Sequence, residues 1–297
     1  MGKASRTKRD GTARERIAAQ RAAAQRAERR QRVLMASGAV VVVIAIVVAF
    51  IVIKANNKPS AVTGSATGTA LSATVLHEVA TVPASTLTAV GIGSTYPKPI
   101  TPITGTQLIS NGKPEVLYIG AEYCPYCATE RWAMAVALSR FGTFTGLHGI
   151  HSSPSDVYPN TPTLTFYKSA YTSRYITFTP VEETTVSKAT LQNPTPQQTR
   201  LIAKYDAPPY VQQSNAGSIP FVDFGNKYMI SGASYNPQVL QGKTWAQVAA
   251  ALSSPSDPIA QGVDGSANLI TAAICKMTNN QPASACTATV KALEAKL

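Results

Sequence analysis

The segment from Val33 to Ile53 contains 21 consecutive residues without a charge and is rich in valine, isoleucine and alanine. As an α-helix, at about 1.5 Å per residue, it would be roughly 30 Å long, which matches the hydrocarbon core of a bilayer. Within a bilayer the segment must satisfy its own backbone hydrogen bonds, so we expect a helix despite the many β-branched residues. The sequence therefore predicts one transmembrane helix over residues 33–53.

Two other interpretations of this apolar segment were weighed. A cleaved signal peptide would have a shorter apolar run and a cleavage site of small residues, and neither is clear here. A twin-arginine export signal could use Arg29 and Arg30, but the apolar stretch is long and hydrophobic for such a signal. The uncleaved anchor is the interpretation that we carry forward.

The net charge of +12 comes mainly from the N-terminal tail. Residues 1–32 hold 11 Lys and Arg against three acids, which leaves 16 basic and 12 acidic residues in the remainder. Basic residues flanking a transmembrane helix stay in the cytoplasm, so we expect a cytoplasmic tail and an extracytoplasmic C-terminal part. The tail either lies on anionic lipid or serves only as a topology signal, and we expect no nucleic-acid partner.

The chain after the predicted anchor divides into a linker and a soluble domain. Residues 54–74 are rich in Ser, Thr, Ala and Gly, which is typical of a flexible stalk. Residues 75–297 are expected to form the extracytoplasmic domain. Within it, Glu115–Gly120 is a short apolar run that predicts a buried strand, and a helix should follow from about Pro125 to Phe141.

The order of the expected strands and helices along the domain predicts an α/β fold with a small mixed sheet. Strands are expected at Ile219–Phe224 and Lys227–Ser231, because Gly225-Asn226 suits a two-residue hairpin turn. Residues 142–192 look like an insertion, in which Thr163–Tyr167 and Arg174–Val181 could pair as a hairpin. Further helices are predicted at about 194–205, 244–252, 267–277 and 287–297, the last two forming a C-terminal helical hairpin at about 265–297.

Cys124 and Cys127 lie where the predicted strand meets the predicted helix, separated by Pro125 and Tyr126. A cysteine at a helix N-terminus has free N–H groups and the positive end of the helix dipole to stabilise its thiolate. Pro125 suits the first helical turn, where its missing N–H costs nothing. Cys127 would lie one turn further on, within reach of a mixed disulfide on Cys124. The pattern therefore indicates a dithiol that exchanges with other disulfides.

The residues Ala121–Cys127 resemble the active site of the thioredoxin superfamily, and Cys-Pro-Tyr-Cys is the glutaredoxin type of motif. Ser218-Ile219-Pro220 before a strand resembles the superfamily's cis-proline loop, which pairs with a substrate chain. The resemblance implies a thioredoxin-like sheet, Cys124 as nucleophile, Cys127 as resolving thiol and Pro220 as the substrate-loop proline. The whole chain also resembles an uncharacterised family of single-span prokaryotic membrane proteins, a domain of unknown function.

One position departs from the thioredoxin pattern. Thioredoxins carry a buried acid six residues before the first cysteine, where it helps to take the proton of the second, and this chain has Tyr118 there. Glu122 or Glu130 could substitute, although Glu130 is interpreted more simply as a solvated helix residue. Water could also carry the proton.

Cys275 and Cys286 enclose ten residues between two predicted helices. We expect them to form a structural disulfide, which would stabilise the domain by about 3 kcal/mol in the chain-entropy model. A second redox pair that relays electrons to the first is the alternative.

Two weaker patterns follow the dithiol. His148 and His151 give a Cys-x2-Cys…His-x2-His arrangement, but both spacings miss the usual zinc-finger ranges, so we expect no metal. The aromatic residues of the insertion could line a substrate groove or simply pack in the core: Tyr158, Phe166, Tyr167, Tyr171, Tyr175 and Phe178.

The sequence thus predicts a membrane-anchored, extracytoplasmic thiol–disulfide oxidoreductase that needs no bound cofactor, because the dithiol carries the electrons. Its expected partners are exported proteins that contain cysteine, membrane lipid and a membrane redox protein. The alternative is a non-catalytic thioredoxin-fold subunit that binds or assembles a membrane complex. Whether the protein would act as oxidase, reductase or isomerase is not encoded in these residues.

Overall fold

Strand β4 (Lys113–Gly120) lies at the centre of the fold, because buried apolar side chains project from both of its faces. The computed structural model describes residues 68–297, and these belong to a single compact unit. The predicted tail and transmembrane helix lie outside the described residues. Between Gly68 and Leu297, no helix is both long and apolar enough to cross a membrane.

The central sheet is mixed, as the sequence predicted. β10 (Phe221–Phe224) runs antiparallel to β4, and β11 (Tyr228–Ser231) runs antiparallel to β10. β9 (Thr177–Glu182) lies on the other side of β4 and runs parallel to it, with Gly120 opposite Glu182. The predicted hairpin is confirmed, and both Gly225 and Asn226 have the positive φ that its turn requires.

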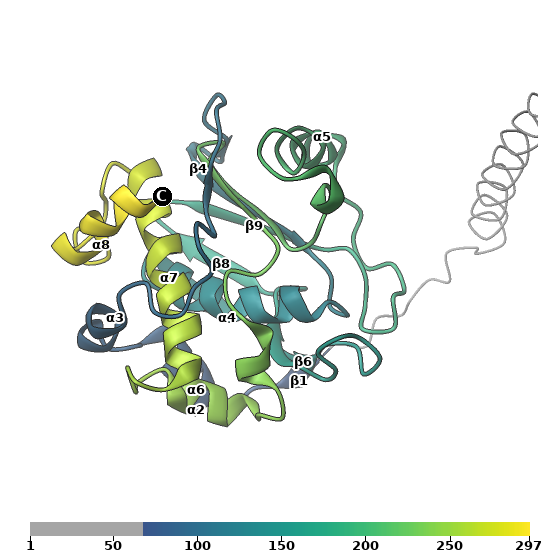
Figure 1. The fold of residues 1–297 in the computed structure, drawn as a ribbon, viewed down its shortest axis with the longest axis vertical. Coiled ribbons are helices and arrows are strands. Elements are labelled where there is room, and N and C mark those ends of the chain that lie inside the picture. Colours follow the sequence, from purple (N-terminus) through teal and green to yellow (C-terminus); the bar gives the residue numbers. More distant parts are fainter. Residues whose placement is uncertain (1–67) are drawn as a thin grey trace, which may run out of the picture. The chain divides into compact units, whose positions relative to one another are not determined.

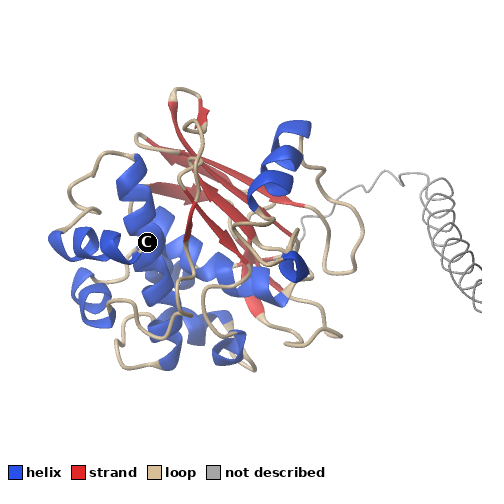
Figure 2. Cartoon of the chain, turned by 45° about the horizontal axis from the view of Figure 1, so that its top comes forward, coloured by secondary structure: helices blue, strands red, loops and turns tan. Residues whose placement is uncertain are grey.

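Helices cover both faces of this sheet (Figures 1 and 2). α4 (Pro125–Ser139) and α7 (Pro258–Met277) pack on one face, where Val116 and Tyr118 of β4 point. α5 (Pro196–Tyr205) covers the other face, which Leu117 and Ile119 reach. Successive side chains of a strand point to opposite faces, so the unbroken apolar run of β4 fits a strand that is buried on both.

The remaining elements extend the sheet or surround α4 and α7. Their bounds are β1 (Thr69–Ala70), α2 (Ala73–Ala80), α3 (Ala84–Val90), β2 (Thr101–Pro102), β3 (Ile109–Ser110), β5 (Gly142–Thr145), β6 (His148–His151), β7 (Pro162–Thr165), β8 (Ala170–Ser173), α6 (Trp245–Ala251) and α8 (Ala288–Leu293), with 3-10 turns at Gln213–Asn215, Pro237–Leu240 and Glu294–Lys296. β2 pairs with β11 and β3 with β4, while β1, β6 and β7 form a second sheet and β5 and β8 a third.

The hairpin predicted inside residues 142–192 is wrong. β7 pairs with β6, whereas β9 belongs to the central sheet as the parallel neighbour of β4. Alternating polarity identifies a half-buried strand, but it does not identify the partner of that strand. The segment inserted between α4 and the central sheet therefore ends before Thr177, where β9 begins.

Two boundaries also differ from the predictions. The end of the predicted stalk is wrong, because β1 pairs with β6 and α2 already begins at Ala73. α7 begins at Pro258 and not near Ala267, since Asp257 caps its first turn by accepting a hydrogen bond from the Ile259 N–H at 2.8 Å.

Candidate active site

The dithiol lies at the first turn of α4, directly after the edge of the sheet where β4 ends. Cys124 has extended backbone angles and is the N-cap residue of α4, and its Sγ accepts a hydrogen bond from the Cys127 N–H at 3.2 Å. Pro125 occupies the first helical position, as the sequence suggested. Both cysteines are present as free thiols, and both are buried.

Several contacts act on the sulfur of Cys124. Its interaction with the Cys127 side chain is the largest of the effects that lower the pKa of Cys124 below its usual value. The Cys127 N–H and the positive charge of Arg131 act in the same direction, while burial opposes them. A thiol with a lowered pKa supplies more thiolate at neutral pH, which is the form that attacks disulfides.

Cys127 has the opposite character. It is fully buried, and burial raises the pKa of its thiol well above the usual value. The hydrogen bond with Cys124 and the charge of that residue raise it further. The two sulfurs are therefore chemically unequal, because Cys124 ionises more readily than an ordinary cysteine and Cys127 ionises less readily.

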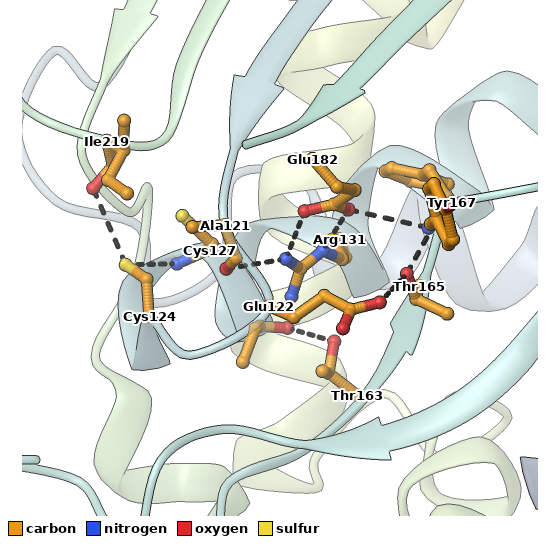
Figure 3. A network of polar contacts seen from close by, with 12 residues as sticks. Ala121, Glu122, Cys124, Cys127, Arg131, Thr163, Thr165, Tyr167, Glu182 and Ile219 are labelled. Carbon is orange, nitrogen blue, oxygen red and sulfur yellow. Dashed lines mark hydrogen bonds and ion pairs between the residues drawn. The ribbon is translucent and has the colours of Figure 1, made fainter. Parts of the chain in front are cut away.

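The loop before β10 approaches the dithiol because β10 is paired with β4. Phe221 lies opposite Ile119, so the residues just before Phe221 come beside the residues just after β4. The Ile219–Pro220 peptide bond is cis, and the Ile219 carbonyl oxygen lies 3.7 Å from the Cys124 Sγ, which donates to it (Figure 3). Ser218 does not reach the sulfur, and its hydroxyl instead donates to the Asn215 carbonyl at 2.6 Å.

A buried ion pair lies behind the dithiol, and the sequence analysis did not identify it. Arg131 follows Cys127 by one helical turn, and its Nε and Nη2 donate to the two carboxylate oxygens of Glu182 at 2.8 and 2.6 Å (Figure 3). Nη2 also donates to the Ala121 carbonyl at 2.8 Å. Arg131 thereby ties together α4, the end of β4 and β9. The signal that could have found it is an arginine in the midst of an otherwise apolar helix.

Tyr118, which stands where thioredoxins carry the acid, and the two candidate substitutes for that acid have different surroundings. Tyr118 is fully buried on β4, and within residues 68–297 its hydroxyl has no hydrogen-bond partner. Glu122 is buried and accepts a hydrogen bond from the Thr165 hydroxyl at 2.7 Å. The interpretation of Glu130 as a solvated residue is wrong: it is buried, accepts from the Ser234 N–H and hydroxyl, and burial raises its pKa to about 7.

The second cysteine pair is separate from the dithiol. Cys275 near the end of α7 and Cys286 before α8 are joined by a disulfide, and both residues are buried. This confirms the predicted pairing of these two residues.

The weaker patterns resolve into ordinary packing, with one exception. Among the described residues, no group of three or more His, Cys, Asp or Glu could hold a metal ion, and His151 packs against Trp245. Phe166 and Phe178 lie in the core with Phe144, which excludes them from a groove. Tyr158 differs, because its ring packs edge to face against the ring of Tyr126, the exposed residue between Pro125 and Cys127. The two ring centres are 5.9 Å apart.

An open hollow of about 840 Å³ lies beside the lead-in to the dithiol. Glu122, Ser153 and Lys188 are among the residues that line it. The Lys188 ammonium lies over the ring of Tyr123, the residue before Cys124, at 4.7 Å. The hollow therefore lies beside the residues that precede Cys124, and Cys124 itself does not line it.

These features define an α/β protein with a mixed sheet, helices on both faces and an unequal dithiol at the N-terminus of a buried helix. The model of the family described as a domain of unknown function (DUF929) matches residues 100–276. The match covers more than half of the chain, so the protein belongs to the DUF929 family. Neither the curated proteins nor the solved structures contain a match.

Proposed function

We propose that this protein is a thioredoxin-like thiol–disulfide oxidoreductase, held by residues 33–53 in a membrane with its C-terminal domain on the outer side. The observation that carries the proposal is the inequality of the two thiols. Cys124 has a lowered pKa at a helix N-terminus, and Cys127 is buried directly beneath it with a raised one. A purely structural cysteine pair has no need of this difference.

The order of elements around the dithiol supports the thioredoxin-like assignment. The chain runs from β4 through α4 to the parallel β9, then through α5 to the antiparallel hairpin of β10 and β11. The strand, the helix after it, the later helix and the final hairpin follow in the order that the sequence predicted, and β9 adds a parallel strand that was not predicted there. The loop at Ile219 lies opposite Cys124, where a substrate chain would pair.

The chemistry follows from the two sulfurs. The Cys124 thiolate attacks one sulfur of a substrate disulfide, a new S–S bond forms, and the other substrate sulfur leaves as a thiolate that takes a proton from water. Cys127 then loses its proton and attacks the Cys124 Sγ. The second substrate thiol is released, and the protein holds the Cys124–Cys127 disulfide. The same steps in reverse transfer a disulfide to a reduced substrate.

The disulfide between Cys275 and Cys286 supports a location outside the cytoplasm, where such bonds persist. There the substrates would be exported proteins that contain cysteine. A membrane redox protein would return the dithiol to its starting state, because each exchange leaves the two cysteines in the opposite oxidation state.

A trapping experiment tests the proposal. In Cys127→Ser the resolving thiol is absent, so substrate proteins should accumulate as mixed disulfides on Cys124 that disappear on reduction. The double variant Cys124→Ser/Cys127→Ser is the matched control and should trap nothing. If Cys127→Ser also traps nothing in intact cells, the dithiol is not an exchange site, and a role as a non-catalytic subunit of a membrane complex takes its place.

A further inference from the structure

Tyr118 is a buried tyrosine whose hydroxyl has no hydrogen-bond partner within residues 68–297. It stands on β4, six residues before Cys124, and its ring packs against Phe166. An unpaired hydroxyl at a fully buried site destabilises a fold. A phenylalanine at position 118 would pack its ring in the same way without burying an unpaired hydroxyl, so packing does not explain the presence of the hydroxyl.

The hydroxyl of Tyr118 points toward the dithiol. Tyr118 and Gly120 lie on the same face of β4, two residues apart. A Cβ on Gly120 would overlap the Tyr118 hydroxyl, and the same Cβ would lie 3.1 Å from the Cys127 Sγ. The phenol oxygen and the Cys127 sulfur therefore border one small space, which exists because residue 120 has no side chain.

The two carboxylates near Cys127 already accept hydrogen bonds from other residues. Both carboxylate oxygens of Glu182 on β9 accept hydrogen bonds from Arg131. Glu122 accepts from Thr165. Arg131 lies over the ring of Tyr118, with its guanidinium carbon 5.9 Å from the ring centre. Arg131 Nη1 and the Tyr118 hydroxyl both lack a hydrogen-bond partner within residues 68–297. Of these two donors, the Tyr118 hydroxyl is the one that borders the space at Gly120 together with the Cys127 Sγ.

We propose that the Tyr118 hydroxyl donates a hydrogen bond to the Cys127 thiolate during the resolving step, and so performs the stabilising role left open by the missing buried acid. The inference rests on the proposed exchange function. In this step the Cys127 S–H gives its proton to water, and the thiolate forms a bond to the Cys124 Sγ. The bond between Cys124 and the substrate breaks with its electron pair on the substrate sulfur, which takes a proton from solvent. The phenol keeps its proton throughout.

The expected size of the effect follows from the chemistry of thiolates. A hydrogen bond to a charged group changes an equilibrium by about ten- to a hundredfold, so its loss would reduce the thiolate fraction by a similar factor. Without the hydrogen bond the thiolate is more basic and therefore a better nucleophile. This gain in nucleophilicity offsets about half of the loss in thiolate concentration, on a logarithmic scale. The resolving rate should therefore fall by about three- to tenfold.

The test uses the full-length protein and a chromogenic aromatic disulfide as the probe. Reduced protein should release the coloured thiol in two phases: the first when Cys124 is modified and the second when Cys127 resolves the mixed disulfide. In Tyr118→Phe we expect an unchanged first phase and a second phase slowed by about three- to tenfold at neutral pH. Tyr171→Phe is the matched control. The Tyr171 hydroxyl donates to the Leu138 carbonyl at the C-terminal end of α4, far from the cysteines at its N-terminal end, so this variant should slow neither phase.

A pH profile separates this role from a structural one. The second phase should accelerate with pH, and Tyr118→Phe should need a pH about one unit higher to reach the wild-type rate. Slowing of both phases alike at every pH would indicate a general distortion and overturn the proposal. An unchanged second phase in Tyr118→Phe would also overturn it, while leaving the oxidoreductase function intact.

A second readout does not depend on exchange. In Cys124→Ser, Cys127 is the only thiol outside the Cys275–Cys286 disulfide, and its ionisation can be followed by the ultraviolet absorbance of the thiolate. Adding Tyr118→Phe should move this titration about one to two pH units higher. If the Cys127 titration moves while the wild-type protein fails to resolve the mixed disulfide with the probe, the hydrogen bond from Tyr118 is supported and the proposed exchange function is wrong. If it does not move, the proposal for Tyr118 is wrong.

Discussion

Arg131 and Glu182 place two opposite charges in a region from which water is excluded, and each depends on the other. The side chains of both are fully buried. A buried ion pair contributes little compared with apolar residues of the same volume, but removing one partner leaves an uncompensated charge. The positive charge of Arg131 also lowers the pKa of both cysteines, so the pair acts on the chemistry as well as on the fold.

We therefore predict that Glu182→Gln lowers the free energy of unfolding by about 3–5 kcal/mol, because the guanidinium loses its counter-charge. The double variant Arg131→Met/Glu182→Leu should recover most of that loss, since no charge is left buried. In the double variant the pKa of Cys124 should rise, and its alkylation at neutral pH should be slower. Denaturant unfolding and timed alkylation measure the two effects. A double variant that is as unstable as Glu182→Gln would contradict this account.

No local pattern in the sequence could have paired these two residues. They are 51 positions apart and meet only because β9 lies parallel to β4, with Glu182 opposite Gly120. The positions of Cys124 and Cys127 were predictable because a strand, a proline and a helix are adjacent in the sequence. The unpaired hydroxyl of Tyr118 was not predictable, because it depends on the space above Gly120.

Among the elements, those with a clear local pattern were predicted well. β4, α4 and the hairpin of β10 and β11 follow from an apolar run, a capped helix start and a Gly-Asn turn. β9 was recognised as a strand but given the wrong partner, since alternation does not determine pairing. The first half of α7 was missed because Gly262 and Gly265 lower helix propensity, and the contacts that favour glycine there are not visible in the sequence.

Those two glycines allow α7 to approach its neighbours closely. A Cβ on Gly265 would collide with the carbonyl oxygen of Ile92, which is backbone and cannot move aside cheaply. Helix propensity alone favours Gly265→Ala by about 1 kcal/mol. We predict the opposite sign, a loss of about 1–3 kcal/mol through overpacking. Denaturant unfolding measures this change, and a more stable Gly265→Ala would show that α7 has room at this position.

Three acids of the domain are buried and form no ion pair among residues 68–297. Burial raises the pKa of Glu130 and of Asp223 to about 7, and that of Asp264 to about 8. Neither carboxylate oxygen of Asp264 has a hydrogen-bond partner within residues 68–297. The folded state therefore keeps these protons to a higher pH than the unfolded state, which releases them near pH 4.

Stability should consequently fall as the pH rises from about 4 to about 8, because over this window the folded state binds more protons. The lowered pKa values of His151 and Cys124 act in the opposite direction, but the raised pKa values of Asp206 and Glu183 add to the effect of the three acids. We predict a thermal midpoint at pH 8 lower than at pH 5 by on the order of 5 °C. Asp264→Asn should flatten this dependence. A midpoint that rises between pH 5 and pH 8 would contradict the prediction.

The central claim, that Cys124 and Cys127 form an exchanging dithiol, is tested most directly by the reduction potential of this pair. Equilibration with glutathione buffers, followed by alkylation and mass analysis of each cysteine, gives that potential, and the buried Cys275–Cys286 disulfide serves as an internal reference that should stay oxidised. We predict a value between about −120 and −270 mV for the dithiol, the range of dedicated exchange proteins. A value below about −300 mV would make it a structural disulfide and contradict the proposed function.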